Sequence, residues 1–377
     1  MADVERILIV GGGIAGLTVA SALHQQGFRP ELVERSPTWQ AIAIGAGIGV
    51  QPNGMRIMHA LGMGAAIEQR GWINRQWCFC DQQGGVLSET DLEALWGGVG
   101  RWVAIARVDL HEVLVAGAAA VPQRLGLSVT SLTQHASGVS AGFSDGSSGE
   151  YDLVVGADGI GSTARRLTIS PARPADLGAM NWRGIAPIRP RGLTTLRFLL
   201  GDACFFGLTP VSEGRTYGFG YVMQPRFHDP VEGRLARLRD RFAEFGPLVR
   251  EYLGAFERDE EIHCAAMEWV DVEPWYRGRI VLIGDAAHAS SPLMGQGGCM
   301  AMEDAYVLAE ALRSAPTIES GLSMYVSRRK PRVKWVQQQS IATAEALRMP
   351  PAARNAALRE RGDQMMRSRF GPLIPAP

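Results

Sequence analysis

Arg6-Ile-Leu-Ile-Val-Gly-Gly-Gly-Ile-Ala-Gly-Leu17 is the first stretch of the chain that can form a complete structural unit. Its apolar run, Ile7 to Val10, predicts a buried parallel strand that leads directly into a glycine turn. Gly11, Gly13 and Gly16 fit the spacing G-x-G-x-x-G, and apolar residues recur at helical intervals after the turn. Strand, turn and helix therefore follow in the order of a dinucleotide-binding unit.

The three glycines of this turn have separate physical roles. Gly11 allows the tight turn, Gly13 lets a pyrophosphate approach the backbone, and Gly16 permits close packing of helix on strand. Ile14 and Ala15 open the helix, whose free N–H groups and positive dipole end attract an anion. The alternative is a glycine-rich turn in an ordinary strand-helix-strand unit that binds no ligand.

A carboxylate at the end of the next predicted strand favours the ligand-binding interpretation. Glu34 lies 18 residues beyond Gly16, where such a unit places the acceptor for ribose hydroxyls. Because strand, turn, helix and acidic strand end are all present, the sequence predicts a dinucleotide ligand.

The composition excludes several classes of partner. Lysine plus arginine and aspartate plus glutamate both number 38, so the net charge is zero and no nucleic-acid partner is predicted. The five cysteines show no zinc-finger or C-x-x-C spacing, so no metal site is predicted and free thiols in a reducing cytoplasm are expected. No apolar run approaches the roughly 18 residues of a membrane span. A soluble, cytoplasmic protein without a membrane partner is expected.

A second glycine-rich stretch runs from Ile42 to Asn53. It cannot form a regular helix, because Gly45, Gly47, Gly49 and Pro52 each weaken one. A loop pressed against a flat ligand would use such glycines, since a ring system can lie on backbone without side chains. A β-hairpin with bulges is the alternative.

The middle of the chain breaks the alternation of strands and helices. The predicted elements are a short helix (54–69), a hairpin (73–90), a helix from 105, an antiparallel meander (127–150) and two helices (234–245 and 248–256). Residues 180–269 have the strand spacing of an antiparallel sheet, and this block is the candidate substrate domain. Its aromatic residues could line a pocket for a planar ligand, although aromatic residues in strands also form plain core.

Two later strands end in motifs at which open α/β sheets bind ligands. One predicted strand ends in Asp158-Gly159, and another ends in Gly284-Asp285. The glycine loop Gly295 to Gly298 then precedes a helix that begins near Cys299. An aspartate at a strand end can accept ribose hydroxyls, and the glycine loop aims N–H groups at another part of the ligand. The motifs predict two ends of one long ligand.

Together these motifs resemble those of the single-component FAD-dependent aromatic hydroxylases, the family of para-hydroxybenzoate, salicylate and urate hydroxylases. The resemblance spans residues 6 to about 340. Asp158-Gly159 with Ser162 and Arg165 is the diagnostic motif, because generic FAD oxidoreductases seldom share it. The FAD contacts that the resemblance implies are Gly11, Gly13, Ile14, Ala15, Gly16, Glu34, Arg35, Gly47, Arg107, Asp158, Gly159, Asp285, Gly295, Gly297 and Gly298. It also puts residues 45–53 beside the isoalloxazine ring.

The resemblance implies a mixed α/β fold of the α+β kind. A Rossmann-like FAD-binding domain is expected, with an inserted antiparallel-sheet substrate domain and a C-terminal helix. The expected boundaries are 1–72, 91–175 and 271–345 for the FAD-binding domain, 73–90 and 176–270 for the substrate domain, and 346–377 for a C-terminal tail.

The implied activity is hydroxylation of an aromatic or heteroaromatic small molecule. NADH or NADPH would bind transiently and reduce FAD, O₂ would add at the flavin C4a, and the hydroperoxide would deliver one oxygen atom. Tyr217 is expected to be the catalytic base, with Arg183 as its charge partner and Phe205, Phe219 and Pro292 as walls. Phe205 stands where a urate-type arginine is expected, which favours a more apolar substrate. A monomer or homodimer is expected.

Two other functions are compatible with the motifs. One is a flavin-dependent reductase or dehydrogenase of an isoprenoid-like substrate, which would insert no oxygen. The other is a binding protein that holds FAD but has lost turnover, although the intact glycines argue against such decay. His288 is interpreted as a packed loop residue and Cys299 as an inert helix-start cysteine, with an activated thiol as the alternative.

Overall fold

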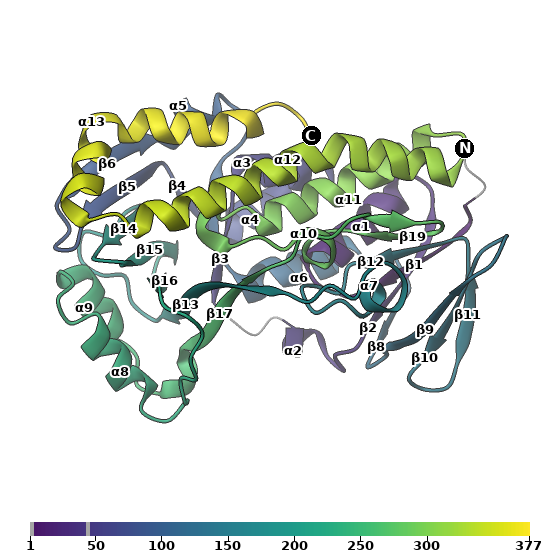
Figure 1. The fold of residues 1–377 in the computed structure, drawn as a ribbon, viewed down its shortest axis with the longest axis horizontal. Helices are drawn as coiled ribbons and strands as arrows, with labels where there is room; N and C mark the ends of the chain where they lie inside the picture. The colour runs from purple at the N-terminus through teal and green to yellow at the C-terminus, as the bar shows by residue number, and fades with distance from the viewer. Residues whose placement is uncertain (1–3, 43–45) are drawn as a thin grey trace.

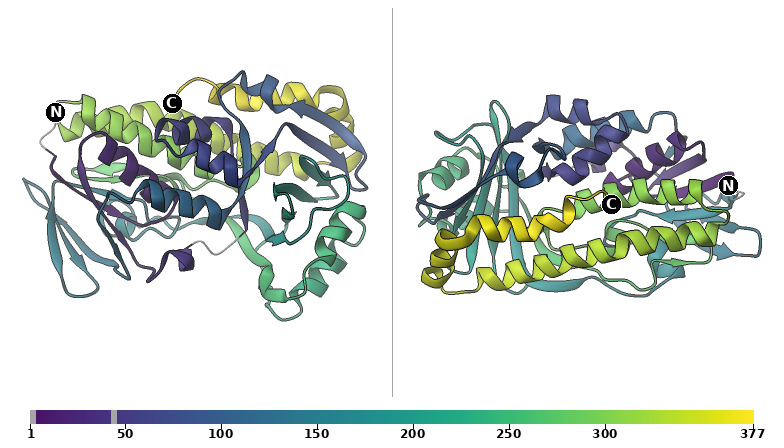
Figure 2. Two further views of the ribbon diagram at one scale, coloured as in Figure 1. Left: turned by 180° about the vertical axis from the view of Figure 1, so that it is seen from behind. Right: turned by 90° about the horizontal axis from the view of Figure 1, so that it is seen from above.

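The computed structural model describes residues 4–42 and 46–377. The described part of the chain is elongated, with a mostly parallel sheet toward one end and a larger mixed sheet toward the other (Figure 1). The long helix α12 runs along both parts. Seen from above, α12 and α13 lie on the same face of the molecule (Figure 2).

The mostly parallel sheet contains all three predicted ligand motifs. Its strand order is β18-β19-β12-β1-β2-β8, and every pair is parallel except β18 with β19. The strands are β1 (Arg6–Val10), β2 (Arg29–Glu34), β8 (Gln123–Leu125), β12 (Leu153–Gly156), β18 (Tyr276–Arg277) and β19 (Ile280–Leu282). Because β1, β12 and β19 are parallel neighbours, the motifs at their carboxyl ends meet at one edge of the sheet.

Helices cover this sheet and connect it to the rest of the chain. The α-helices are α1 (Ile14–Gln25), α2 (Trp39–Ile42), α3 (Pro52–Ala60), α4 (Gly64–Arg70), α5 (Leu92–Trp96), α6 (Arg107–Gly117), α7 (Thr163–Thr168), α8 (Arg234–Arg241), α9 (Pro247–Gly254), α10 (Asp285–His288), α11 (Gly297–Ser314), α12 (Ile318–Leu347) and α13 (Pro351–Phe370). Three short 3₁₀ helices are η1 (Asp259–Glu261), η2 (Pro292–Met294) and η3 (Gly371–Leu373). The helix that follows the first glycine turn, α1, packs along α11. The two glycine-rich helix starts are close in space, since a Cβ on Gly298 would lie 3.6 Å from the Ile14 side chain.

The larger sheet has the order β17-β13-β16-β15-β14-β5-β6. Its strands are β5 (Gln76–Asp81), β6 (Val86–Asp91), β13 (Ala175–Ala186), β14 (Leu196–Leu200), β15 (Cys204–Ser212), β16 (Arg215–Val222) and β17 (His263–Trp269). The predicted hairpin is present as β5 and β6, but β14 pairs with β5 in parallel. The strands within residues 180–269 pair antiparallel with one another, as expected, and the parallel contact is made with β5, outside that block. The exception arises because β5 enters from a separate, earlier segment, so no hairpin determines its direction relative to β14.

Two smaller sheets complete the fold. The predicted meander is present as β9 (Val129–Gln134), β10 (Val139–Phe143) and β11 (Ser148–Tyr151). The other small sheet joins β3 (Gly47–Val50), β7 (Trp102–Ala106) and β4 (Trp72–Asn74). Its strand β3 belongs to the second glycine-rich stretch, whose last residues, Pro52 and Asn53, begin α3. This stretch therefore contains a paired strand where a loop was expected.

Two segments differ from their sequence-based description. The single helix predicted over residues 54–69 is divided into α3 and α4, because Gly62 has a φ of +78° that ends the first helix. The predicted C-terminal tail, residues 346–377, is largely the helix α13, which packs against β6.

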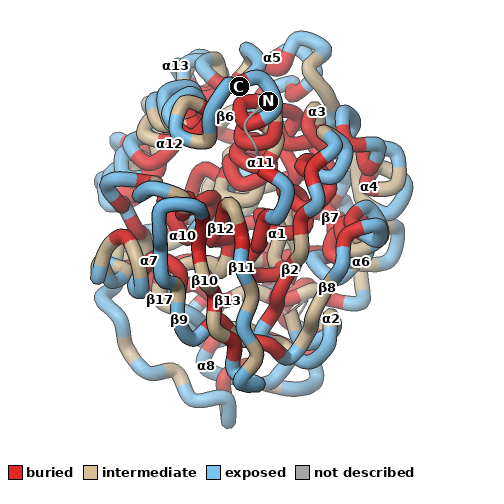
Figure 3. The backbone as a smooth tube through the Cα atoms, turned by 90° about the vertical axis from the view of Figure 1, so that its right-hand side faces the viewer, coloured by how far each residue is buried: buried red, intermediate tan, exposed pale blue. Residues whose placement is uncertain are grey.

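The buried residues concentrate in the strands and in the helices between them, while exposed residues occupy the loops (Figure 3). A second apolar cluster lies between the larger sheet and the helices α8 and α9. Within residues 4–42 and 46–377, no helix combines the length and apolar character that a membrane crossing requires.

Candidate active site

A cavity of about 390 Å³ lies between the two larger sheets. Its wall includes the carboxyl-end segments after β1, β12 and β19, the strand β3, and the facing strands β13 to β16. The predicted residues that line it are Gly13, Ile14, Ala15, Gly47, Arg107, Gly159, Arg183, Phe205, Tyr217, Phe219, Asp285, Pro292, Gly295, Gly297 and Gly298. Segments more than 250 residues apart in sequence therefore form one site.

Two predicted glycines lie behind the cavity wall and shape the first turn. Gly11 has a φ of +107°, and a Cβ there would lie 2.6 Å from the carbonyl oxygen of Ala157. A Cβ on Gly16 would lie 1.8 Å from the carbonyl oxygen of Gly11. Gly13, in contrast, meets nothing within 4 Å and faces open space. The close approaches at Gly11 and Gly16 are internal packing, which leaves Gly13 as the glycine beside the ligand space.

The acidic strand end also supports the turn from behind. Glu34 is buried, and its carboxylate accepts hydrogen bonds from the backbone N–H of Gly12 at 2.7 Å and of Ser36 at 2.8 Å. His111 from α6, which the sequence did not single out, bonds the carbonyl of Gly12 at 2.9 Å through Nε2. Burial lowers the pKa of His111, so its neutral ring donates this bond. Arg35 is exposed and does not line the cavity.

The Asp158-Gly159 motif is divided between two tasks. The Asp158 carboxylate accepts hydrogen bonds from the N–H groups of Thr163 at 2.6 Å and Ala164 at 3.0 Å, and from the Ser162 hydroxyl. It therefore caps the first turn of α7. Gly159 lines the cavity. A second residue of the motif, Arg165, is buried and joins this loop to the third motif, as it donates to the carbonyls of Ile160 at 2.6 Å and Ala286 at 2.7 Å.

Asp285 is the clearest open acceptor of the cavity. Across the described residues its carboxylate has no hydrogen-bond or ion-pair partner, although the residue lines the cavity. Asp285 is exposed within the open cavity, yet the surrounding protein desolvates its carboxyl and raises its pKa, while the charges of His288 and Arg107 lower it. A Cβ on the neighbouring helix-start residue Gly297 would meet only Asp285, at 3.9 Å. An unpartnered acceptor beside two glycine helix starts fits a long ligand with hydroxyls and an anionic group, as FAD has.

The opposite wall of the cavity is aromatic. Phe205 stacks on Tyr221 with ring centroids 4.5 Å apart and planes at 11°. Trp77 stacks on Phe198 with centroids 4.7 Å apart and planes at 8°. The sequence had singled out Phe205 but missed the other three and Trp102, since these residues lie on four strands without a local motif. Such a wall suits a planar ring.

Two polar side chains interrupt this aromatic wall. The buried Nε of Arg183 has no hydrogen-bond partner, and across the described chain its guanidinium pairs with no carboxylate. The Tyr217 ring packs on Gly47, where a Cβ would lie 2.6 Å from the ring. Burial raises the pKa of Tyr217, although Arg183 and Arg107 lower it, so the phenol is protonated at neutral pH. Gly45, which was expected in the same region, lies outside the described residues.

His288 and Cys299 carry side chains that can act in catalysis, but neither residue lines the cavity. His288 is buried, and its Nε2 lies 2.5 Å from the Asp304 carboxylate. Cys299 is buried too, and burial raises the pKa of its thiol to about 12. The interpretation of His288 as a packed residue is confirmed, and the interpretation of Cys299 as inert stays a prediction that its burial supports.

A family model described as an FAD binding domain matches residues 4–340. PtnB3, a 3-amino-4-hydroxybenzoate 2-monooxygenase of Streptomyces platensis, is 34% identical over 375 residues, which cover 94% of this chain and 91% of that protein. An FAD-dependent urate hydroxylase of Klebsiella pneumoniae is 33% identical over 352 residues, with 87% of each chain covered. The solved structure of Klebsiella pneumoniae HpxO complexed with FAD and uric acid is similar with a TM-score of 0.90 and 28% identity, over 99% of this chain and 97% of that one.

Proposed function

This chain belongs to the family of single-component FAD-dependent aromatic hydroxylases, on the match to the FAD binding domain model over residues 4–340 and on the relatives at 33% and 34% identity. We propose that it uses NADH or NADPH to hydroxylate an aromatic or heteroaromatic small molecule. In the balanced reaction, one atom of O₂ enters the substrate as a hydroxyl group. The other atom leaves as water, and the reaction consumes one hydride from the nicotinamide cofactor and one proton from solvent.

The residues of the cavity support this assignment of cofactor. When bound, FAD supplies the uptake of a hydride and the activation of O₂, at C4a of its ring in the predicted scheme. The N–H groups at the start of α1 would hold its pyrophosphate, and Asp285 would accept hydroxyl donors from its sugar chain. The Gly295 to Gly298 loop at the start of α11 would lie near the flavin ring. Arg107, which lines the cavity without a partner among the described residues, would add positive charge.

The observation that carries the proposal is the unpaired Arg183 within an aromatic wall. A guanidinium in a pocket of low polarity favours an anionic or readily ionised ring substituent, because its own charge has no carboxylate partner there. Arg183 would thereby lower the pKa of a substrate phenol and hold the phenolate, whose ring carbons are electron-rich. The aromatic residues would orient the ring and exclude water from the reacting atoms.

Tyr217 is proposed to contact the phenolic oxygen of the substrate. Because its phenol is protonated at neutral pH, it first donates a hydrogen bond to that oxygen. In its predicted role as base, the Tyr217 hydroxyl would turn so that its oxygen accepts the phenolic proton of the substrate while its own proton passes to water. Arg183 and Arg107 would stabilise the phenolate that forms.

Phe205 bears on the choice of substrate. Urate presents polar atoms around its whole edge, whereas Phe205 offers a ring stacked on Tyr221 at the position where a urate-type arginine was expected. A phenol or aromatic acid with one polar side and one apolar side fits this wall better than urate. The five cysteines, all free, support the proposed cytoplasmic location.

The proposal is tested by NADH and NADPH oxidation of the FAD-loaded protein with phenols, aromatic acids, hydroxypyridines, quinolones and purines. We expect one phenol or aromatic acid to stimulate oxidation and to gain the mass of one oxygen atom. Urate is the matched control, and it should stimulate less. If oxidation is stimulated but the product gains no oxygen, the enzyme is a reductase or dehydrogenase. If no compound stimulates oxidation, the hydroxylase proposal fails in favour of an FAD-holding binding protein.

A further inference from the structure

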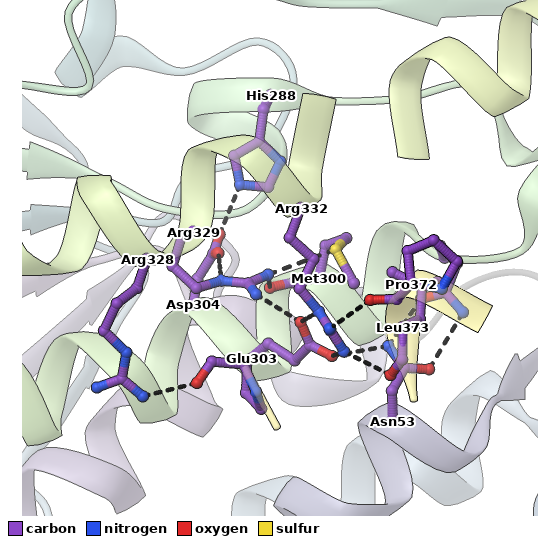
Figure 4. A network of polar contacts seen from close by, with 12 residues as sticks. Asn53, His288, Met300, Glu303, Asp304, Arg328, Arg329, Arg332, Pro372 and Leu373 are labelled. Atoms are coloured by element: carbon purple, nitrogen blue, oxygen red, sulfur yellow. Dashed lines mark hydrogen bonds and ion pairs between the residues drawn. The ribbon is translucent and has the colours of Figure 1, made fainter. Parts of the chain in front are cut away.

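A cluster of buried charged side chains lies behind the cofactor motifs and outside the cavity. Its members are Glu303 and Asp304 of α11, Arg329 and Arg332 of α12, and His288 of α10 (Figure 4). The side chains of Glu303, Asp304 and Arg329 are 0% exposed. Charges buried this completely need partners in defined positions, so the cluster holds its elements in one arrangement.

Arg329 joins the two acidic residues. Its Nη1 lies 2.5 Å from Glu303, its Nε lies 2.8 Å from Asp304, and its Nη2 donates to the carbonyl of Met300 at 3.3 Å. The planar guanidinium has donors in fixed directions, so one side chain sets the positions of both carboxylates. Lysine, with one compact ammonium group, could not reach both in the same way.

Asp304 holds the Gly284-Asp285 turn directly. Its Oδ2 accepts a hydrogen bond from the N–H of Gly284 at 2.9 Å and a second from His288 at 2.5 Å. Gly284 has a φ of +56°. The next residue in sequence is Asp285, the open acceptor of the cavity. The direction in which Asp285 points therefore depends on a turn that Asp304 anchors.

Glu303 holds the glycine loop through a chain of amides. Asn53 donates from Nδ2 to Glu303 and to Oε1 of Gln296, both at 2.9 Å. Gln296 donates to Oε1 of Gln51 at 2.9 Å, and Gln51 donates to the carbonyls of Met294 at 2.8 Å and Gly295 at 3.3 Å. An anionic carboxylate accepts hydrogen bonds only, so Glu303 fixes the donor direction of every amide in this chain.

We infer that Arg329 is a positioning residue for FAD, which sets the separation of the Gly284-Asp285 turn from the Gly295 to Gly298 loop. Arg329 lies on α12, outside all three motifs in the sequence, and it does not line the cavity. The Gly284-Asp285 turn is bonded to the cluster through Asp304, and the Gly295 to Gly298 loop is bonded to it through Glu303. Residues of the turn and of the loop both line the cavity. The inference rests on FAD as the cofactor and not on the identity of the substrate.

The test compares three variants by FAD titration of the apoprotein and by the visible spectrum of bound flavin. Arg329→Met should raise the FAD dissociation constant at least tenfold and shift the flavin spectrum. The FAD dissociation constant of Arg329→Lys should lie between those of Arg329→Met and the unaltered protein. Arg328→Met is the matched control, because Arg328 is the neighbouring residue on α12 and pairs at 3.0 Å with the partly exposed Glu310. It should change neither quantity by more than twofold.

A further variant, Asn53→Ala, tests the inference if Arg329→Met does not fold. Asn53→Ala removes the amide chain but leaves Glu303 paired with both arginines, so it leaves no buried charge unpaired. It should raise the FAD dissociation constant at least threefold and shift the spectrum while circular dichroism is unchanged. A folded Arg329→Met, or a folded Asn53→Ala, that binds FAD within twofold of the unaltered protein with the same spectrum would overturn the inference. These readouts do not depend on turnover, so they stand apart from failure of the hydroxylase proposal.

Discussion

The two walls of the cavity are built in opposite ways. The cofactor wall presents backbone: Gly13 opens onto free space, a Cβ on Gly297 would meet only Asp285 at 3.9 Å, and the side chains that support them lie behind. The substrate wall presents side chains, such as the stacked pair of Phe205 and Tyr221. A wall of backbone is specified by turns and helix starts within short stretches of sequence. A wall of side chains is specified by the pairing of strands from distant stretches.

The difference has a functional consequence. The cofactor wall would keep its form as long as the glycine turns and the buried charges behind them are intact, whereas the substrate wall can change one side chain at a time. Substitutions in the first wall should therefore affect folding and FAD binding. Substitutions in the second should affect turnover and substrate preference with FAD retained.

The largest effect is expected at the first glycine turn, where two neighbouring glycines separate folding from ligand binding. Gly16→Ala should destabilise the apoprotein by about 3 kcal/mol, because its Cβ would meet the Gly11 carbonyl oxygen at 1.8 Å. Gly13→Ala should leave the apoprotein stable within about 0.5 kcal/mol, since its Cβ meets nothing within 4 Å, yet weaken FAD binding. Denaturant unfolding and FAD titration measure the two effects. If both variants destabilise the apoprotein equally, the two glycines do not separate folding from FAD binding.

The next effect concerns the hydroxyl of Tyr217 on the substrate wall. Tyr217→Phe should lower kcat about 100-fold, because one preorganised hydrogen bond to the reacting oxygen is lost. FAD binding should be unchanged. Tyr252→Phe is the control, since that hydroxyl bonds the carbonyl of Gly184 at 2.8 Å in the second apolar cluster and should affect stability without kcat. Steady-state rates with the stimulating compound decide, and an unchanged kcat in Tyr217→Phe would remove this residue from the reaction.

A third effect concerns acid stability behind the cofactor wall. Burial is the largest influence on Asp304 and would raise its pKa, but His288 and Arg329 together lower it to about 2. Because the folded pKa is below the usual value of about 4, the carboxylate stabilises the fold above pH 4, and this contribution is lost as the pH falls toward 2. Asp304→Asn should cost on the order of 2 kcal/mol at neutral pH. Its unfolding free energy should also fall less steeply between pH 4 and 2. A parallel pH profile for both proteins would contradict the assignment.

The smallest effect is expected for the aromatic stack. Phe205→Leu should raise KM for an aromatic substrate about fivefold, which corresponds to about 1 kcal/mol for one aromatic contact. FAD binding should not change. Phe206→Leu is the matched control, because Phe206 belongs to the second apolar cluster and does not line the cavity. If both variants change KM equally, the stack does not contact the substrate.

The same contrast explains what could be predicted from the sequence. The first βαβ unit, the Asp158-Gly159 motif and the Gly284-Asp285 motif were recognisable because turn, strand end and helix start are adjacent in sequence. Trp77 and Tyr221 were not, because their place in the cavity depends on the register of paired strands and on the parallel contact of β14 with β5. No local periodicity encodes that contact.

The buried charged cluster could be predicted only in part from the sequence. Glu303 and Asp304 are adjacent acidic residues in an otherwise apolar helix start, and this pattern could have indicated a buried pair. Their partner Arg329 could not be assigned, since a basic residue on a helix is usually exposed.

The central claim is that this chain inserts one atom of O₂ into an aromatic ring. The measurement that tests it most directly is the mass of the product formed under ¹⁸O₂ from the compound that most stimulates NADH or NADPH oxidation. We expect a product that carries one ¹⁸O atom, with no label when ¹⁸O is supplied as water. A product without ¹⁸O from O₂ would contradict it.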